Sequence, residues 1–100
     1  MDYEYFTTFW ADFSIAEAFG EHAIEDTAAR AYEEWKDDVK YLTELVMILN
    51  HKCWDFYRHG NEELCTLYED LYYEYYDKAS EYLDNKGNTE DLSYFFSTLD

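Results

Sequence analysis

The chain contains no proline, and nothing between Glu21 and Arg58 interrupts a helix. Apolar side chains recur three or four positions apart through this stretch, from Ile24 and Ala28 to Phe56, and so share one helix face. One helix over the whole stretch would be about 57 Å long, which is awkward in a domain of this size. A break inside the stretch is therefore expected.

Asp37 and Asp38 stand where that break is predicted, because an aspartate carboxylate can accept hydrogen bonds from the free N–H groups of the next helical turn. The sequence thus predicts two helices, 21–36 and 39–58. A single bent helix over the same stretch is the alternative that this pattern leaves open.

Two further helices are predicted in the C-terminal half. A strongly amphipathic helix over 62–83 follows a turn at Gly60, and a short helix over 90–98 follows Gly87. Glycine commonly takes the left-handed position that ends a helix. The predicted fold class is therefore all-α: a compact bundle of about four to five helices with a central helical hairpin, 39–58 against 62–83.

A chain of 100 residues buries one core, so residues 1–100 are predicted to form a single acidic helical domain. The centre of that core should hold leucines from the facing sides of the hairpin. These are Leu45, Leu49, Leu67 and Leu71.

The N-terminal segment carries a different signal. Ser14 and Glu17 fit a capping box, in which the two residues satisfy free N–H groups of a first helical turn, so a short helix over 14–19 is predicted. The aromatic segment before it, Tyr3–Phe13, is interpreted as a partly extended arm that packs on the core.

The charge of the chain restricts its partners. It carries 24 Asp and Glu residues against 7 Lys and Arg residues, a net charge of −17 with neutral histidines. Aromatic residues make up 22% of the chain, too many for an intrinsically disordered protein. The negative charge repels phosphates, which argues against direct binding to nucleic acid or to an anionic membrane. A folded acidic domain of this kind is expected to bind a basic partner.

Targeting and membrane signals are lacking in the sequence. The first twenty residues contain no Lys or Arg, which argues against a secretory signal. The longest apolar run, Leu45–Leu49, falls far short of the roughly 20 residues that span a bilayer. Two cysteines are too few for a disulfide framework. We therefore expect a cytoplasmic protein with reduced thiols.

Acidic side chains follow one face of the predicted helix 62–83, at the helical repeat of about 100° per residue. We call this face the acidic stripe; its members are Glu63, Asp70, Glu74, Asp77, Glu81 and Asp84. The last five form a row about 21 Å long with a charge about every 5 Å. Like charges one turn apart oppose helix formation, and a merely solvated face usually mixes signs. The stripe is therefore predicted to face a partner, with a solvated face as the alternative.

Tyrosines lie beside the stripe. Tyr72, Tyr73, Tyr75 and Tyr76 fall within five helical positions and cannot all face one core. Tyr73 and Tyr76 point away from the apolar face. Because tyrosine adds contact area at low entropic cost and stacks with arginine, both are predicted to contact the same partner. The alternative is that the last helix or the N-terminal arm covers them.

No sequence motif for catalysis or metal binding is present. The chain lacks Gly-x-Ser-x-Gly, His-Glu-x-x-His, Cys-x-x-Cys and a glycine-rich phosphate loop. Cys53 and Cys65 can lie at one level of the hairpin, but with His59 they give at most three zinc ligands where a structural site needs four. Two packed thiols are predicted, and no enzyme activity, metal or cofactor is expected.

Two segments resemble known sequences: Thr7–Gly20, TTFWADFSIAEAFG, and Tyr41–Lys52, YLTELVMILNHK. They are similar to a group of small acidic, uncharacterised proteins of phages and mobile elements in gut bacteria. The resemblance covers roughly residues 1–60 and implies a setting in which small acidic proteins often counter host defence. Several unrelated anti-restriction and anti-CRISPR proteins act as DNA mimics, offering carboxylates to the DNA-binding groove of a nuclease.

These features favour an acidic DNA-mimic-type inhibitor of a host defence nuclease, working in the cytoplasm of a bacterial host. Its expected partner is a basic nucleic-acid-binding protein. The alternative is a helical protein–protein interaction module of a phage or mobile element, in which acidity serves solubility. The two hypotheses differ in salt response, since electrostatic binding weakens at high ionic strength and apolar contact barely changes.

Overall fold

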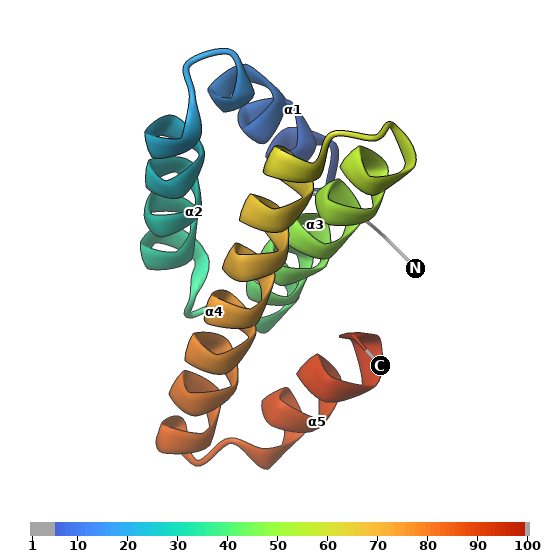
Figure 1. Cartoon of the computed structure of the whole chain (residues 1–100). Helices are drawn as coiled ribbons and strands as arrows, with labels where there is room; N and C mark the ends of the chain where they lie inside the picture. The colour runs from blue at the N-terminus through green and yellow to red at the C-terminus, as the bar shows by residue number, and fades with distance from the viewer. Residues whose placement is uncertain (1–5, 100) are drawn as a thin grey trace.

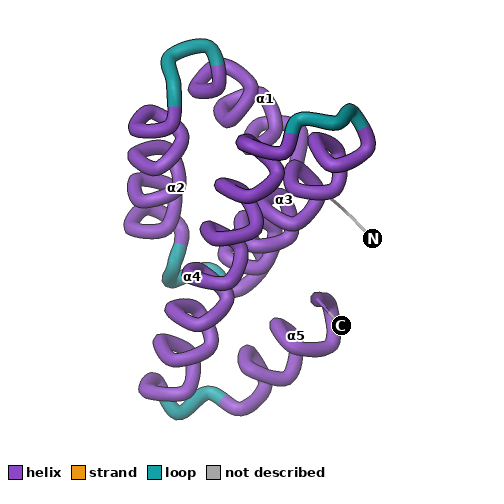
Figure 2. The backbone as a smooth tube through the Cα atoms, in the orientation of Figure 1, coloured by secondary structure: helices purple, strands orange, loops and turns teal. Residues whose placement is uncertain are grey.

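The computed structural model describes residues 6–99, which form five helices joined by short turns (Figure 1, Figure 2). The helices are α1 (Phe6–Glu17), α2 (Glu21–Trp35), α3 (Val39–Arg58), α4 (Glu62–Lys86) and α5 (Thr89–Leu99). They pack into a body of 39 × 24 × 24 Å. The predicted all-α bundle is confirmed.

The hairpin of α3 and α4 is the centre of the bundle, as the sequence predicts. Figure 1 shows α4 crossing in front of α3, with α2 on one side of it and α5 on the other. Leu45 and Leu49 of α3 pack in one core with Leu71 and Tyr75 of α4. α4 runs beyond residue 83 to Lys86, because Gly87 is the residue that takes the left-handed conformation, with φ of 73°.

A short turn separates α2 from α3, so the prediction of two helices is confirmed. Asp38 is the N-cap of α3, and its Oδ1 accepts a hydrogen bond from the backbone N–H of Lys40 at 3.1 Å. Capping by a carboxylate satisfies an N–H group that has no partner within the helix. Asp37 bonds elsewhere and joins this turn to α4, as described below.

The N-terminal segment packs on the core through Phe9 and Phe13, as predicted, but its predicted secondary structure is wrong. Where the sequence indicated an arm up to Phe13 and a helix over 14–19, α1 is one continuous helix that begins at Phe6 and ends at Glu17. Ser14 lies inside this helix and is not its cap. The start of the predicted arm, residues 3–5, lies outside the described residues.

Tertiary packing explains why α1 is longer than predicted. Phe9, Phe13 and Ala16 follow one another at intervals of four and three positions, and all three are buried in the common core. Thr and Phe have modest helix propensity, so the local sequence favours a helix only weakly. Burial of one face against the hairpin supplies the stability that the local propensity lacks.

A buried lysine ties α1, α3 and α4 together. Lys52 is 2% exposed, and its Nζ lies 3.0 Å from Glu17 Oε2. The same Nζ donates a hydrogen bond to Ser14 Oγ at 2.7 Å and lies 4.0 Å from the centre of the Trp10 ring, within the range of a cation–π contact. The Tyr68 hydroxyl donates to the same Glu17 oxygen at 2.6 Å. The buried charge is therefore both paired and hydrogen-bonded.

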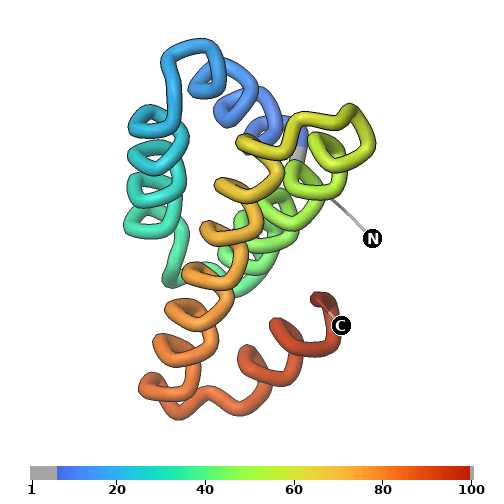
Figure 3. The backbone as a smooth tube through the Cα atoms, viewed as in Figure 1, coloured from blue at the N-terminus to red at the C-terminus, as the bar shows by residue number. Residues whose placement is uncertain are grey.

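α5 packs across the end of the hairpin that lies away from α1 and contacts both α3 and α4 (Figure 3). It agrees closely with the predicted helix 90–98. Asn88 caps it, with Oδ1 accepting from the backbone N–H of Asp91 at 3.1 Å. Phe95 is fully buried and anchors the helix on the hairpin.

Leu49 and Leu67 should respond differently to truncation. Leu49 is fully buried, whereas Leu67 lies at the margin of the core and is only partly buried, so the central position predicted for Leu67 is wrong. We expect Leu49→Ala to lower the free energy of unfolding by about 2–5 kcal/mol and Leu67→Ala to lower it by less than half as much. Urea denaturation of both variants measures the difference. Equal losses would contradict the packing described here.

Candidate functional site

The acidic stripe lies on an exposed side of α4. All six of its carboxylate-bearing residues are exposed. The buried residues of the same helix are Tyr68, Leu71, Tyr75, Ala79 and Leu83. Because these residues hold the helix against the core, α4 cannot rotate, and the stripe keeps a fixed orientation over about 32 Å from its first to its last member.

Few lysine or arginine side chains neutralise the stripe. Within residues 6–99, Glu74 is the stripe member that forms an ion pair, with its Oε2 3.4 Å from Lys78 Nζ. Other lysines pair with acids outside the stripe: Lys52 in the core, Lys36 with Glu33 and Lys86 with Asp37. The stripe therefore presents a surface of nearly uncompensated negative charge.

The N-terminal end of the stripe joins a shallow acidic depression between α2 and α4. The depression has a volume of about 490 Å³, and Glu21, Glu62, Glu63 and Asp70 contribute carboxylates to its lining. Glu63 and Asp70 were predicted members of the stripe. Glu21 and Glu62 were missed, because the periodicity of one helix cannot show that the start of α2 lies beside the start of α4. Four carboxylates concentrate negative potential at this end.

The C-terminal half of the stripe is held to the turn between α2 and α3. The Tyr82 hydroxyl donates to the Asp37 carboxylate, and Lys86 Nζ lies 3.3 Å from the same oxygen. These hydrogen bonds, from Tyr82 and then Lys86, hold the pKa of Asp37 below its usual value. Their contribution to stability is therefore present at neutral pH and is lost as the pH falls below the ordinary range of aspartate. The Tyr32 hydroxyl adds a 3.4 Å hydrogen bond to the carbonyl of Lys78.

The two tyrosines predicted beside the stripe occupy different environments. Tyr73 is 61% exposed and is available to a partner. Tyr76 is partly buried, and its ring centre lies 5.4 Å from that of Phe95 and 6.0 Å from that of Phe96. The alternative that the last helix covers these tyrosines therefore holds for Tyr76 and not for Tyr73.

Cys53 and Cys65 meet across the hairpin as two free thiols, with their Sγ atoms 3.7 Å apart. The predicted packing of the two thiols is confirmed. His59 is exposed, and its Nδ1 lies 2.7 Å from the backbone oxygen of Asp55. Within residues 6–99, no three His, Cys, Asp or Glu side chains are arranged to hold a metal ion.

The two thiols should differ in reactivity. Burial and the hydrogen bond with Cys65 raise the pKa of the Cys53 thiol to about 12. The reactive thiolate of Cys53 is then about a thousandfold rarer at pH 8 than that of an ordinary cysteine. We expect Ellman's reagent to modify the partly buried Cys65 in Cys53→Ala much faster than the buried Cys53 in Cys65→Ala. Each variant reports one thiol alone, so Cys53 cannot displace the reagent from a modified Cys65 3.7 Å away. Equal rates in the two variants would contradict the burial of Cys53.

The raised pKa of the Cys53 thiol determines the direction in which the stability of the fold changes with pH. The folded state keeps the Cys53 proton up to about pH 12, whereas the unfolded thiol loses it near its ordinary value. This thiol therefore stabilises the fold fully below the pKa that it has in the unfolded state. That stabilisation is lost as the pH rises toward the pKa that it has in the folded state. As the pH is raised above neutral, the urea concentration at the midpoint of unfolding should fall, and it should fall less in Cys53→Ala than in the unchanged protein.

The geometry is that of an exposed surface of one sign on a rigidly held helix. Comparison of the chain with protein-family models, curated proteins and solved structures finds no match. None of the helices within residues 6–99 is long and apolar enough to cross a membrane. A functional conclusion therefore has to come from the charge and shape of the surface itself.

Proposed function

We propose that this chain is an acidic DNA-mimic-type inhibitor that occupies the nucleic-acid groove of a host defence nuclease, as an anti-CRISPR or anti-restriction protein. The observation that supports this most directly is the exposed row of carboxylates on α4. The row stands on a helix whose opposite face is buried, so its charges are presented in a fixed line.

The spacing of the row suits a groove that binds DNA. Successive members from Asp70 to Asp84 are three or four residues apart, or about 5 Å along the helix axis, whereas B-DNA carries a phosphate about every 3.4 Å on each strand. Lys has a long, flexible side chain, and Arg has several N–H donors on one guanidinium group. Both can therefore reach acceptors whose spacing differs from that of DNA phosphates. Carboxylates in place of phosphates accept charge-assisted hydrogen bonds from these side chains.

Neighbouring residues extend the same surface. Glu21 and Glu62 add charge at the N-terminal end of the row, in the acidic depression. Tyr73 offers an exposed ring next to Glu74, where it can stack on an arginine of the nuclease. Tyr76 contributes mainly by supporting α5.

The proposed inhibitor acts by occupying the DNA-binding groove of the nuclease. It works in the cytoplasm of a bacterial host that carries a phage or mobile element. It uses no catalytic residue, cofactor or metal ion. It does not bind nucleic acid itself, since its net charge of −17 repels phosphates.

Affinity capture tests this function. The tagged chain is incubated with lysates of bacteria that carry CRISPR or restriction systems, and the retained protein is identified. We expect a basic nuclease, from which duplex DNA displaces the chain, with affinity weakening at least about tenfold between about 50 and 200 mM salt. A captured nuclease that binds DNA and this chain at the same time would contradict mimicry.

A helical protein–protein interaction module is the second candidate, because large aromatic side chains are exposed away from the stripe. Trp54 and Tyr57 of α3 are 54% and 66% exposed, and their rings pack edge to face at 5.6 Å. Exposed aromatic residues are enriched at protein interfaces. If this is the main function, Trp54→Ala with Tyr57→Ala abolishes capture at low and high salt alike, and neutralising the stripe changes little.

A further inference from the structure

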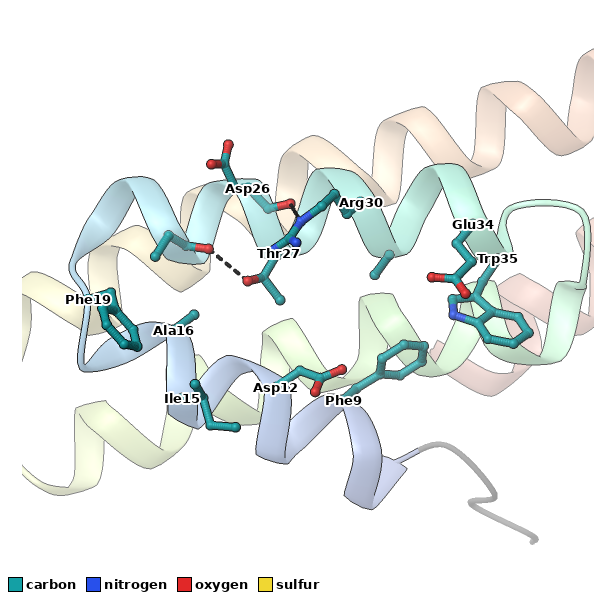
Figure 4. Close-up of a pocket in the computed structure, with 12 residues that line it drawn as sticks. Phe9, Asp12, Ile15, Ala16, Phe19, Asp26, Thr27, Arg30, Glu34 and Trp35 are labelled. Carbon is teal, nitrogen blue, oxygen red and sulfur yellow. Dashed lines mark hydrogen bonds between the residues drawn. The ribbon is translucent and has the colours of Figure 1, made fainter.

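A groove between α1 and α2 shares no residue with the acidic stripe (Figure 4). Its volume is about 540 Å³. Ala23, Thr27 and Ala31 of α2 line it at intervals of four residues. Because these side chains are small, α1 and α2 leave space between them that larger side chains would fill.

Large apolar side chains border this space. Ile15 and Phe19 line the groove while remaining 62% and 79% exposed. Figure 4 shows Phe19 at the end near the α1–α2 turn and Trp35 at the other end. From Ala23 to Trp35 the α2 wall is about 18 Å long, the length of slightly more than three helical turns. The groove therefore has the length and apolar lining that suit a short helix.

The charge around the groove selects its occupant. Asp12, Asp26 and Glu34 line it as exposed carboxylates. One base, Arg30, is part of the lining, with its Nε 3.4 Å from the backbone oxygen of Asp26. Three acids against one base favour an occupant with positive charges beside its apolar face. A second copy of this chain, itself carrying −17, is disfavoured by repulsion.

We propose that this groove binds a basic amphipathic helix of a partner protein. Apolar side chains one turn apart on that helix would pack between Ile15 and Phe19 at one end and Trp35 at the other. Its Lys and Arg residues would flank this face and pair with the carboxylates around the groove. The groove and the stripe use different residues, so this interaction holds whether or not the stripe binds a nuclease.

The test uses a labelled peptide of about four helical turns, with leucines on one face and lysines elsewhere. One control peptide has the same composition with the leucines scrambled, and another has glutamate in place of lysine. We expect the amphipathic lysine peptide to bind at least tenfold more tightly than both controls. Amide chemical-shift changes should concentrate on α1 and α2. Equal binding of the scrambled peptide, with shifts spread over the acidic surface, would reduce the interaction to general charge attraction and overturn the proposal.

Matched variants locate the site. Ile15→Ser with Phe19→Ser changes two exposed residues and should weaken peptide binding at least tenfold, while Tyr94→Ser removes an exposed aromatic ring from α5, outside the proposed binding surfaces, and should not. Far-ultraviolet circular dichroism checks that each variant folds. An equal loss from both variants would contradict the groove as the binding site.

Two other occupants give distinguishable results. A dimer in sedimentation that dissociates in the Ile15→Ser, Phe19→Ser variant would assign the groove to a second copy of the chain. Binding of the peptide only after removal of residues 1–5 would assign it to the chain's own N-terminal segment. Either result overturns the proposal, and neither bears on the stripe, which is tested separately through the captured nuclease.

Discussion

Replacing Lys52 with alanine should destabilise the fold by about 3–5 kcal/mol, a large share of the stability of a domain this small. The lysine is 2% exposed and pairs with Glu17, whose side chain is 16% exposed. Without the ammonium group, the hydrogen bond from the Tyr68 hydroxyl is what a mostly buried carboxylate keeps among its partners within residues 6–99. The loss also removes the contact of Nζ with the Trp10 ring and the hydrogen bond to Ser14. Urea denaturation at pH 7 measures the change.

A less buried lysine, the C-cap of α2, provides the matched control. Lys36 forms an ion pair of the same length, 3.0 Å, with Glu33, but the two side chains are 28% and 69% exposed. Lys36→Ala should therefore cost less than about 1 kcal/mol. The double variant Lys52→Met, Glu17→Gln should lose less than the sum of the two single variants, since neither charge is left alone. A Lys52→Ala variant as stable as Lys36→Ala would contradict the role of this network.

The helices could be predicted from the sequence wherever local chemistry and apolar periodicity agree. Asp38 caps α3, and Gly87 ends α4, because an N-cap carboxylate and a left-handed glycine act within one turn of their own position. At Ser14 and Glu17 the local pattern predicts a helix start that is wrong. They match a capping box, yet both lie inside α1 and interact with Lys52, 38 and 35 positions away (52 − 14 and 52 − 17).

The candidate site could be predicted in part, for a similar reason. The stripe belongs to one helix, so its periodicity alone places six carboxylates on one face, and all six are exposed. Glu21, which joins it from α2, and Phe95, which covers Tyr76 from α5, depend on how separate helices pack. The groove between α1 and α2 could not be predicted at all, because the weak helix propensity of the segment before Ser14 does not indicate that most of α1 is a helix.

Neutralising the stripe should weaken binding of the captured nuclease on the order of a hundredfold or more, about 3 kcal/mol. The variant carries amides at five positions: Asp70→Asn, Glu74→Gln, Asp77→Asn, Glu81→Gln and Asp84→Asn. Amides keep the size of the side chains and their helical positions, so the change isolates charge. Each stripe carboxylate that lies close to a lysine or arginine of the nuclease loses its attraction to that side chain. The affinity should therefore depend less steeply on salt concentration. Titration at several salt concentrations measures both effects.

The fold should tolerate this change. Asp70 and Glu74, like Asp77 and Glu81, are like charges four positions apart, and removing their repulsion stabilises a helix by a few tenths of a kcal/mol per pair. The loss of the Glu74–Lys78 ion pair works in the other direction but is small, because both side chains are about half exposed. The melting temperature should therefore stay the same or rise, so weaker binding cannot be attributed to unfolding.

The decisive comparison is with five acids that lie off the stripe. The matched control neutralises residues that lie away from both the stripe and the groove between α1 and α2: Glu25, Glu33, Glu69, Glu90 and Asp91. Glu17 is left unchanged, because it holds Lys52 in the core. Both variants lose five negative charges, and so both lose the same long-range attraction to a basic protein. If the carboxylates of α4 stand in for phosphates, the stripe variant loses far more affinity than the control. Equal losses would mean that the nuclease responds to the overall field of the chain, and no loss from the stripe variant would end the mimic hypothesis for α4.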